Sequence, residues 1–486
     1  MTTAKSRGPF SRICRTEAAA ARQKGDAVYP MGWTHTLKEL SAVIDAAPVS
    51  PGVAFHAVST DTRTLIPGAV FFALKGERFD GNAFVGEAFA KGACAAVTTR
   101  PSDAGPCLVT PDPLAALQRF AAWHRQRFAP ALIAITGSCG KTTSKDLVAA
   151  VLGSRHRIVK TRGNLNNEIG CPLSLLEIDD GTDAAVIEMG ASHVGEIARL
   201  CRWAQPTEAA VTLVAPAHLE GFGSVRKVAQ AKAEIVDALP SDGVFYVNMD
   251  DEWCVRMAES FPGVKVRYGT LGDVVLEGCE RDPSGDMRLR VRPVGELRLP
   301  IPSRAHAWNV LLAIAVGLRH GVGTRHGVCE SARYYEVPLR RACLESSRFK
   351  VLSAGGVEII DDSYNANPAS MAAALDALAE RPARNRVAAF GDMLELGNEA
   401  PVYHRRLGEQ AGKLGLGCVF ARGTFAQHIV DAARAAGVSC AEVVQDHGRM
   451  AEALRAVVGP GDVVLVKGSR GMKMECVVEA LMQLLV

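Results

Sequence analysis

The chain has 486 residues, of which 48% are hydrophobic and 22% charged, so it is long enough for two to four ordinary globular domains. Its 55 basic and 52 acidic residues leave a net charge of +3, which gives no reason to expect nucleic acid or a membrane surface as a partner. No apolar run approaches the ~20 residues that span a bilayer. The thirteen cysteines show no C-x-x-C spacing, so we expect reduced thiols in a cytosolic protein rather than a disulfide framework or a zinc site.

Residues 1–30 differ in composition from the rest of the chain. They carry six Lys or Arg against Glu17 and Asp26 and show little periodicity. No apolar segment follows the charges, which argues against a signal peptide. We expect a disordered extension, or a start codon assigned too early with Met31 as the true start.

The remaining sequence divides into three blocks, at 31–130, 131–337 and 338–486. The first contains short strand-like runs such as Val70–Leu74. In the other two, strands alternate with helices, and this pattern predicts an α/β fold with parallel sheets covered by helices. Because ligands of such sheets bind beyond the carboxyl ends of the strands, candidate residues are sought there.

The first such strand, Ala131–Thr136, is followed by G-S-C-G-K-T (137–142) and then by a helical pattern. Backbone N–H groups and the helix N-terminus can bind phosphates there, Lys141 supplies a positive charge, and the Thr142 hydroxyl can hold Mg²⁺. Ile135 stands where the usual phosphate-binding loop has its first glycine. A turn rich in small residues is the alternative, but the strand-to-helix junction favours nucleoside triphosphate binding.

Two further strand ends carry candidate metal ligands. Glu188 follows the apolar strand Ala184–Ile187 and would suit Mg²⁺, although it could equally cap a helix starting near Ser192. His218 follows the strand Ala209–Val214. A lone loop histidine is more often neither a metal ligand nor a substrate contact, so its role depends on its neighbours.

Lys232 lies where an apolar residue is expected. The pattern predicts a helix over Ser224–Leu239 with Ser224 as its N-cap, and Lys232 falls in the middle of the apolar face. Burying an ammonium is costly unless it is paired or chemically altered, and a desolvated lysine has a lowered pKa and becomes nucleophilic. Alternatively, its stem packs on this face while the charged end reaches solvent.

Polar loops follow three strands of the last block. They are D-D-S-Y-N-A-N-P (361–368), G-D-M-L-E-L-G (391–397) and K-G-S-R-G (467–471). Any one of them could be an ordinary turn. The last precedes a helix and is typical of a carboxylate or phosphate site.

Together these segments resemble the Mur ligases of peptidoglycan synthesis over nearly the whole chain from Met31. The motifs that carry the resemblance are STDTR (59–63), ALKGERFDG (73–81), GSCGKTT (137–143), GNLNNEIGCPLSLL (163–176), VIEMGASHVGEI (186–197), AHLEGFGS (217–224), AKAEI (231–235), DDSYNANPASM (361–371), GDMLELG (391–397) and KGSRGMKME (467–475). GNLNN, SYNANP and GDMLELG indicate the branch that joins D-alanyl-D-alanine to UDP-MurNAc-tripeptide. The resemblance implies three domains: a small α/β uridine-binding domain (31–130), a central P-loop-type parallel-sheet ATPase domain (131–337) and a C-terminal Rossmann-like α/β domain (338–486).

The resemblance also implies roles for individual residues. The UDP-linked substrate would be bound by Ser59, Thr60, Asp61, Arg63, Lys75, Gly76, Asn164, Asn166 and Asn167. ATP would be bound by Gly137, Ser138, Cys139, Gly140, Lys141, Thr142, Thr143, Asn309, Arg340 and Asp362. Mg²⁺ would be held by Thr142, Glu188 and His218, and Lys232 would carry a carbamate. The catalytic set would be Lys141, Glu188, His218 and Lys232, and the dipeptide would lie near Tyr364, Asn365, Asn367, Lys467, Ser469 and Arg470.

Two positions depart from the family pattern. Asn82 replaces a common histidine, which leaves one contact on the uridine side open. Cys139 stands in the phosphate-binding loop where Ser or Asn is commoner. Because a thiol beside a helix N-terminus can have a lowered pKa, we hypothesise that oxidation of Cys139 inhibits ATP binding, although an inert small residue is the simpler interpretation.

The implied reaction is phosphorylation of the tripeptide carboxylate by ATP, followed by attack of the D-Ala-D-Ala amine on the acyl phosphate, in a cytoplasmic monomer. A diamino-acid ligase of the same family is disfavoured by the DDSYNANP loop, and a folylpolyglutamate synthase by the uridine-side domain. A P-loop switch or transport ATPase stays possible on the loop alone, but it would not explain Lys232. Whether the third peptide residue is Lys or diaminopimelate is open.

Overall fold

The computed structural model describes residues 31–486 except 78, 327 and 347, so the predictions for residues 1–30 lie outside the described residues. The chain divides into two compact units. The first comprises the described residues up to Ile133 with His156–Met189 and Ala198–Pro206, and the second comprises Ala134–Arg155, Gly190–Ile197 and Thr207–Val486. Each unit is described by itself.

The first unit contains a four-stranded parallel sheet in the order β3-β4-β5-β6. Its elements are β1 (His35–Thr36), α2 (Leu37–Ile44), β2 (Ala54–Phe55), β3 (Val58–Ser59), β4 (Val70–Phe72), η1 (Gly81–Phe84), α3 (Val85–Ala90), β5 (Ala95–Thr98), β6 (Cys107–Val109), α4 (Pro113–Gln126), β8 (Ile158–Lys160), α6 (Gly170–Leu175) and β9 (Ala184–Glu188). Strands β8 and β9 form a parallel pair. The buried side chains of β4 and β5 pack on α3, which gives the small α/β domain that the resemblance implies.

Two elements are divided between the units. Strand β7 (Ala131–Thr136) begins in the first unit and ends in the second, whereas α7 (Glu196–Ala204) begins in the second and ends in the first. In the first unit, the buried Arg125 donates to the carbonyl of Ala204 at 3.0 Å, which satisfies a backbone acceptor at the C-terminus of α7.

The second unit holds six consecutive strands in the order β15-β14-β13-β12-β11-β10. Their bounds and those of the accompanying helices are α5 (Lys141–Gly153), β10 (Glu208–Val211), α8 (Leu219–Phe222), α9 (Val225–Asp237), β11 (Val244–Asn248), α10 (Glu252–Ser260), β12 (Val264–Gly269), β13 (Val274–Arg281), β14 (Met287–Arg292), β15 (Gly295–Leu299), η2 (Arg304–His306), α11 (Ala307–Arg319), β16 (Thr324–Arg325), β17 (Val328–Cys329) and α12 (Arg333–Glu345). Strands β10 to β13 are parallel.

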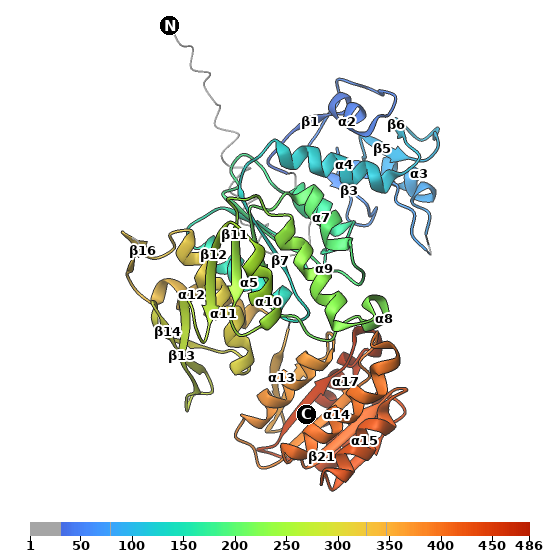
Figure 1. Cartoon of the computed structure of the whole chain (residues 1–486). Helices are drawn as coiled ribbons and strands as arrows, with labels where there is room; N and C mark the ends of the chain where they lie inside the picture. The colour runs from blue at the N-terminus through green and yellow to red at the C-terminus, as the bar shows by residue number, and fades with distance from the viewer. Residues whose placement is uncertain (1–30, 78, 327, 347) are drawn as a thin grey trace. The chain divides into compact units, whose positions relative to one another are not determined.

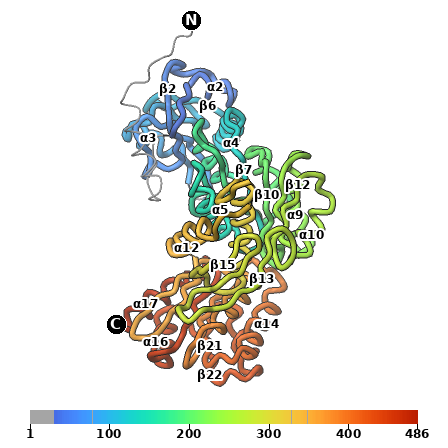
Figure 2. Tube along the Cα trace, turned by 90° about the vertical axis from the view of Figure 1, so that its left-hand side faces the viewer, coloured from blue at the N-terminus to red at the C-terminus, as the bar shows by residue number. Residues whose placement is uncertain are grey.

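The expected alternation of strands and helices stops at β12. Strands β13, β14 and β15 follow one another as an antiparallel meander, which lies beside α12 in Figure 2. Tight turns rather than crossover helices connect antiparallel neighbours, so this segment needs no helix between its strands. The predicted domain boundary at 337/338 falls inside α12.

We call residues 350–486 the C-terminal lobe. Its sheet has the order β18-β19-β23-β20-β21-β22, with only β18 antiparallel to its neighbour. The elements are β18 (Lys350–Ala354), β19 (Val357–Asp362), α13 (Pro368–Ala379), β20 (Arg386–Gly391), η3 (Gly397–Glu399), α14 (Ala400–Lys413), β21 (Cys418–Arg422), α15 (Ala426–Ala435), β22 (Cys440–Val443), α16 (His447–Val457), β23 (Val463–Lys467), η4 (Arg470–Met472) and α17 (Glu475–Leu485). Helices α16 and α17 cover one face of the sheet and α14 the other, which is a doubly wound, Rossmann-like arrangement (Figures 1 and 2).

Candidate functional site

The turn between β7 and α5 has two positions that accept only glycine. Gly137 has φ +144° and Gly140 has φ +82°. A Cβ at Gly137 would lie 1.9 Å from Thr212 Oγ1, and one at Gly140 would lie 2.6 Å from Asn309 Oδ1. The chain therefore makes a close turn at the carboxyl end of β7 and leads directly into the N-terminus of α5 at Lys141, as the sequence predicts.

Hydrogen bonds within the second unit fix the shape of this loop. The Ser138 hydroxyl donates to the carbonyl of Ala215 at 2.8 Å and accepts from its N–H at 3.0 Å. The Thr212 hydroxyl donates to the Cys139 carbonyl at 2.5 Å. Lys141 Nζ donates to the Gly137 carbonyl at 2.7 Å, which folds the cation back over the loop. These contacts hold a preformed turn with a positive charge at a helix N-terminus, which is the chemistry of a phosphate site.

Three residues far along the chain reach this loop. Asn309 accepts a hydrogen bond from Ser144 of α5 at 2.9 Å, and Asn367 donates to the Ser138 carbonyl at 3.1 Å. Arg348, which sequence reasoning did not single out, donates to Thr142 Oγ1 at 3.3 Å. Asn309 and Asn367 thus lie beside the turn between β7 and α5.

Arg340 has other partners in this structure. It pairs with Asp286 and donates to the Arg298 carbonyl at 3.2 Å, on the meander side of α12. Arg348 is the arginine of this region whose guanidinium contacts the phosphate-binding loop. Its guanidinium carbon also lies 3.2 Å from the centre of the Tyr364 ring. The resemblance implied Arg340 as the nucleotide-binding arginine, whereas Arg348 stands in no motif that the sequence analysis identified.

Burial changes the expectation for Cys139. It raises the pKa of the Cys139 thiol, with Lys467 and Lys141 as weaker opposing charges. The lowered thiol pKa that motivated the oxidation hypothesis is therefore wrong, because desolvation penalises the thiolate more than the nearby cations favour it. Cys139 fits the simpler interpretation of a small residue in a tight loop.

The helix that carries Lys232 forms as predicted. Helix α9 begins at Val225, and the hydroxyl of its N-cap Ser224 accepts from Lys227 N–H at 3.3 Å. The Lys232 side chain is 2% exposed, so it does not extend to solvent, and its Nζ lies 5.6 Å from the centre of the Phe222 ring. Burial, and next the charge of Lys141, lower the pKa of Lys232 to about 7. Near neutral pH a large fraction of this amine is uncharged and nucleophilic.

His218 lies at the N-terminus of the short helix α8 with φ +50°. Its Nδ1 forms an ion pair with Glu395 of the loop after β20. The contact with His218 lowers the pKa of the Glu395 carboxyl. The sequence identified both loops as functional but did not connect them.

In the first unit, Glu188 is the last residue of β9 and is 1% exposed. Its N–H donates to the Thr161 hydroxyl at 3.0 Å, and its Oε1 accepts from Asn166 Nδ2 at 2.6 Å. Its Oε2 is buried and has no hydrogen-bond partner among the described residues. The alternative as a helix cap near Ser192 is not supported, because α7 begins at Glu196.

The other candidates of the first unit form local contacts. Arg63 pairs with Asp61 at 2.6 Å, and the Ser59 hydroxyl donates to the Asp61 carbonyl at 2.8 Å, with Thr60 between them. Gly76, after Lys75, donates to the Phe79 carbonyl at 2.9 Å. Asn82, the departure from the family pattern, accepts from Thr99 N–H at 3.1 Å and so closes this loop.

Hydrogen bonds of its asparagine residues define the conformation of the GNLNN segment in the same unit. The Asn164 carbonyl accepts from Asn166 N–H at 2.7 Å. Asn167 Oδ1 accepts from Gly170 N–H at 2.9 Å at the start of α6. These contacts orient Asn166 toward Glu188, so at least one predicted substrate residue also positions a predicted metal ligand.

A buried ion pair lies at the carboxyl ends of the C-terminal strands. Lys467, 1% exposed, donates to Asp362 Oδ2 at 2.5 Å and to the Asn365 carbonyl at 2.8 Å. Burial raises the pKa of the Asp362 carboxyl, with Lys467 acting in the opposite direction. Arg348 and Arg470 both lie near the Tyr364 ring, with Arg470 5.5 Å from the ring centre. This end of the sheet therefore collects the predicted dipeptide residues.

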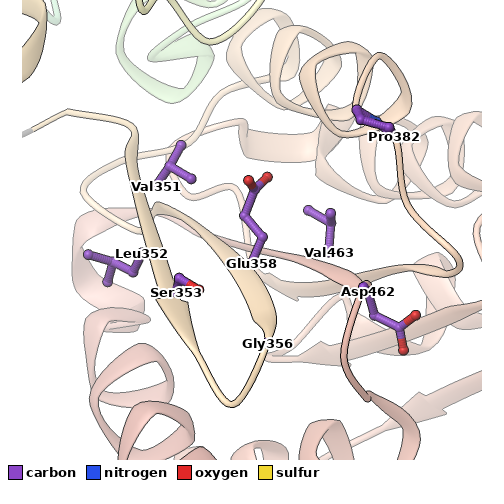
Figure 3. A pocket seen from close by; sticks show the side chains of 9 residues that line it. Val351, Leu352, Ser353, Gly356, Glu358, Pro382, Asp462 and Val463 are labelled. Carbon is purple, nitrogen blue, oxygen red and sulfur yellow. The ribbon is translucent and has the colours of Figure 1, made fainter. Parts of the chain in front are cut away.

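The pocket in Figure 3 lies at the opposite end of that sheet, where the parallel strands begin. It has a volume of about 340 Å³ and is lined by Val351, Leu352, Ser353, Gly356, Glu358, Pro382, Gly461, Asp462 and Val463. Glu358 and Val463 stand at the amino ends of β19 and β23, and Glu358 pairs with Arg381 at 2.7 Å. None of the predicted site residues lines this pocket.

Comparison with protein families gives three matches along the chain. The model described as "Mur ligase family, catalytic domain" matches residues 54–116, "Mur ligase middle domain" matches 135–317, and "Mur ligase, glutamate ligase domain" matches 347–470. The three matched segments fall in the three sequence blocks. The phosphate-binding loop and Lys232 lie within the middle one.

Individual relatives match over nearly their full length. The UDP-N-acetylmuramoyl-tripeptide–D-alanyl-D-alanine ligase of Escherichia coli K12 is 37% identical, with 92% of this chain and 98% of the relative covered. The crystal structure of MurF from Acinetobacter baumannii has a TM-score of 0.85 at 31% identity, covering 94% of this chain and all of that one. MurF from Thermotoga maritima in complex with ADP has a TM-score of 0.75 at 28% identity, covering 88% and 97%. The chain belongs to the Mur ligase family.

Proposed function

We propose that this chain is an ATP-dependent ligase that joins D-alanyl-D-alanine to the terminal carboxylate of UDP-MurNAc-tripeptide. The observation that carries the proposal is the near full-length similarity to relatives named for this activity. The preformed phosphate-binding loop and the buried Lys232 in the same unit support phosphoryl transfer. The ADP complex of a similar structure supports a nucleotide at that loop.

In the proposed reaction, ATP phosphorylates the tripeptide carboxylate, and the D-Ala-D-Ala amine attacks the resulting acyl phosphate. Phosphate leaves and a peptide bond forms, with ADP as the other product. Lys141 and the N–H groups at the start of α5 stabilise the negative charge on the transferred phosphoryl group. Arg348 and Asn367 bring residues of the C-terminal region to the same loop, which supports binding of the amine substrate next to the phosphates.

The residues present fit Mg²⁺ as a cofactor. The buried, unpartnered Oε2 of Glu188 is a hard ligand that lacks a hydrogen-bond donor. We propose Thr142, Glu188 and His218 as protein ligands. No three His, Cys, Asp or Glu side chains in the described part of the chain form a metal cluster by themselves, in keeping with an ion that takes its remaining ligands from phosphates. When bound, Mg²⁺ neutralises charge on the phosphates.

Lys232 supplies a second anionic ligand in this proposal. Its uncharged amine can add to CO₂, forming an N–C bond and releasing one proton, and the product is a carbamate. The carbamate is an anion, and Lys141 is a cation close enough to influence the charge at this position. The lowered pKa of Lys232 supports carbamate formation, because only the uncharged amine reacts.

We further propose that the enzyme acts as a cytoplasmic monomer and binds the UDP end of its substrate through the first unit. The residues that we propose for this binding lie near the Asp61–Arg63 ion pair and the loop that Asn82 closes. Among the described residues, no helix has the length and apolar character needed to cross a membrane.

Phosphate release from Mg-ATP tests the proposal. It is measured with UDP-MurNAc-tripeptide alone, with D-Ala-D-Ala alone and with both, and products are analysed by mass spectrometry. We expect release only with both substrates, together with a UDP-linked pentapeptide. Release that ignores both substrates would instead indicate a plain P-loop ATPase. Separate assays with the Lys- and diaminopimelate-containing tripeptides decide the third residue.

A further inference from the structure

The G-D-M-L-E-L-G loop after β20 has no role in the reaction described so far, yet its Glu395 pairs with a proposed metal ligand. Glu395 Oε2 forms an ion pair with His218 Nδ1. A backbone hydrogen bond joins the same two loops, since Glu220 N–H donates to the Glu395 carbonyl at 3.0 Å. A Cβ added at Gly397 would lie 3.6 Å from Glu220 Cα, so the two backbones are close neighbours. Two loops that are 177 residues apart in sequence are thus joined by an ion pair and a backbone hydrogen bond.

The loop that carries Glu395 is held firmly by its own lobe. The buried Asp392 accepts hydrogen bonds from Thr424 N–H at 2.7 Å and Phe425 N–H at 3.1 Å. Met393 N–H donates to the buried His404 at 2.9 Å, and Leu394 N–H donates to Ser469 Oγ at 2.9 Å. These bonds fix the backbone just before Glu395, and a carboxylate carried by a fixed backbone can orient its partner.

Backbone strain on both sides indicates that the contact is more than an incidental surface ion pair. Glu395 has φ +62° and His218 has φ +50°, a backbone region that residues other than glycine rarely adopt because the Cβ meets the neighbouring carbonyl oxygen. A Glu in this conformation persists only where surrounding contacts hold it.

We propose that Glu395 is a positioning residue for His218. Its carboxylate, which forms the ion pair with Nδ1, holds the ring proton on that nitrogen and leaves Nε2 as the atom that binds a divalent cation. A histidine ligand commonly donates its other ring N–H to a carboxylate, which fixes the tautomer and makes the ligating nitrogen more basic. Because Glu395 belongs to the C-terminal lobe and His218 to the segment after β10, the ring is oriented only while the two loops are joined. This inference rests on the proposed role of His218 as a metal ligand.

The test variant is Glu395→Gly, since glycine accepts φ +62° and keeps the backbone contact to Glu220 while the carboxylate is lost. Glu395→Gln retains an acceptor without charge and serves as the conservative variant. Glu409→Gln, at an exposed position of α14, is the matched control. His218→Gln identifies the His218 signals and reports the effect of losing the ligand itself.

Two measurements need no turnover. Nitrogen-15 chemical shifts of the ring report the tautomer of His218, and electron paramagnetic resonance reports Mn²⁺ binding with a non-hydrolysable ATP analogue. We expect the Nδ1–H form in the parent and in the control. In Glu395→Gly we expect loss of that form and Mn²⁺ affinity weaker on the order of 10–100-fold, with an unchanged unfolding midpoint. Glu395→Gln should be intermediate.

The outcomes separate this inference from the proposed function. If His218→Gln weakens Mn²⁺ binding but Glu395→Gly changes neither the tautomer nor the affinity, the positioning role is overturned and the metal site stands. If His218→Gln leaves Mn²⁺ binding unchanged, both the positioning role and the metal role of His218 fail. Ligase activity of the parent is measured separately and decides the proposed function.

Discussion

At the scale of single residues, Lys232 combines the features that matter most for the chemistry. A position on an apolar helix face forces burial, and burial together with Lys141 lowers the pKa of its amine to about 7. Burying the Lys232 amine without any chemical change would only lower the stability of the protein. The cost becomes useful if the amine forms a carbamate, and two predictions separate these effects.

Replacing Lys232 by alanine should lower ligase turnover by about 100-fold or more, because a group that stabilises transition-state charge is lost. Short carboxylates such as acetate should restore part of the rate by occupying the space of the carbamate. The measurement is phosphate release with both substrates. Lys227→Ala, at an exposed position of the same helix, should retain full activity, and unchanged turnover in Lys232→Ala would exclude the carbamate role.

Replacing Lys232 by methionine should change the pH dependence of stability. Since the folded pKa of Lys232 lies near 7 and its ordinary value is 10.5, the unfolded state binds more protons between these pH values, and stability of the parent rises with pH across that window. We expect Lys232→Met to be more stable than the parent at pH 7, on the order of 3–5 kcal/mol at about 1.4 kcal/mol per pKa unit. The difference should shrink toward pH 10.

Denaturant unfolding in CO₂-free buffer at several pH values measures this difference. Groups that titrate in both proteins cancel in the comparison. Lys227→Met should show a small difference that does not depend on pH in this range. A difference between Lys232→Met and the parent that stays constant from pH 7 to pH 10 would contradict the lowered pKa of Lys232.

At the scale of elements, α9 shows how local sequence signals place a functional side chain. The Ser224 cap fixes where the helix begins, and the start of the helix fixes which face Lys232 occupies. Segment 190–197 also contacts this helix, because Gly195 N–H donates to Oε1 of Glu234 in α9 at 2.5 Å. The phosphate-binding loop depends in the same way on the φ angles of Gly137 and Gly140.

Ser224→Ala should destabilise the protein by about 1 kcal/mol, because an N–H of the first turn of α9 loses its acceptor. Urea unfolding measures the change. Ser224→Asp should restore most of it, since aspartate is an equally good N-cap. Ser241→Ala, at an exposed position beyond the helix, is the control and should have little effect, and an equal loss in both alanine variants would refute the capping role.

At the scale of the whole molecule, the second unit joins residues from distant parts of the chain around one loop. Arg348 and Thr142 are 206 residues apart in sequence, and Asn367 and Ser138 are 229 apart. Asn367 has two separable functions. It caps α13 through Ser370, and its amide donates to the Ser138 carbonyl.

Asn367→Ser should keep the cap and lose the hydrogen bond to Ser138, because serine is a good N-cap with a shorter side chain. We expect ATP to bind about 2–10-fold more weakly, the equivalent of one ordinary hydrogen bond, with little change in the unfolding midpoint. Isothermal titration with a non-hydrolysable ATP analogue measures the affinity. Asn398→Ser, at an exposed position, is the control, and equal affinities in the two variants would contradict the proposed link.

The amino-acid sequence by itself determined the features that depend on neighbouring residues. The periodicity around Lys232 predicted a buried lysine, and the apolar runs predicted β7, β9, β19, β20 and β23 with polar residues at their carboxyl ends. These signals are local, because hydrophobic period, caps and glycine turns act within a few residues. The antiparallel meander β13–β15 was missed, since short alternating runs without crossover helices do not differ enough from the surrounding pattern.

Only the tertiary structure decided the partners. It joined Glu395 to His218, brought Arg348 rather than Arg340 to Thr142, and surrounded Cys139 so that desolvation raises its thiol pKa. None of these features can be recognised in the neighbouring sequence, because each depends on how elements separated by tens to hundreds of residues pack together. Strand and helix formation is encoded over short distances along the chain, whereas the choice of ion-pair partner and the desolvation of a titratable group depend on the completed packing.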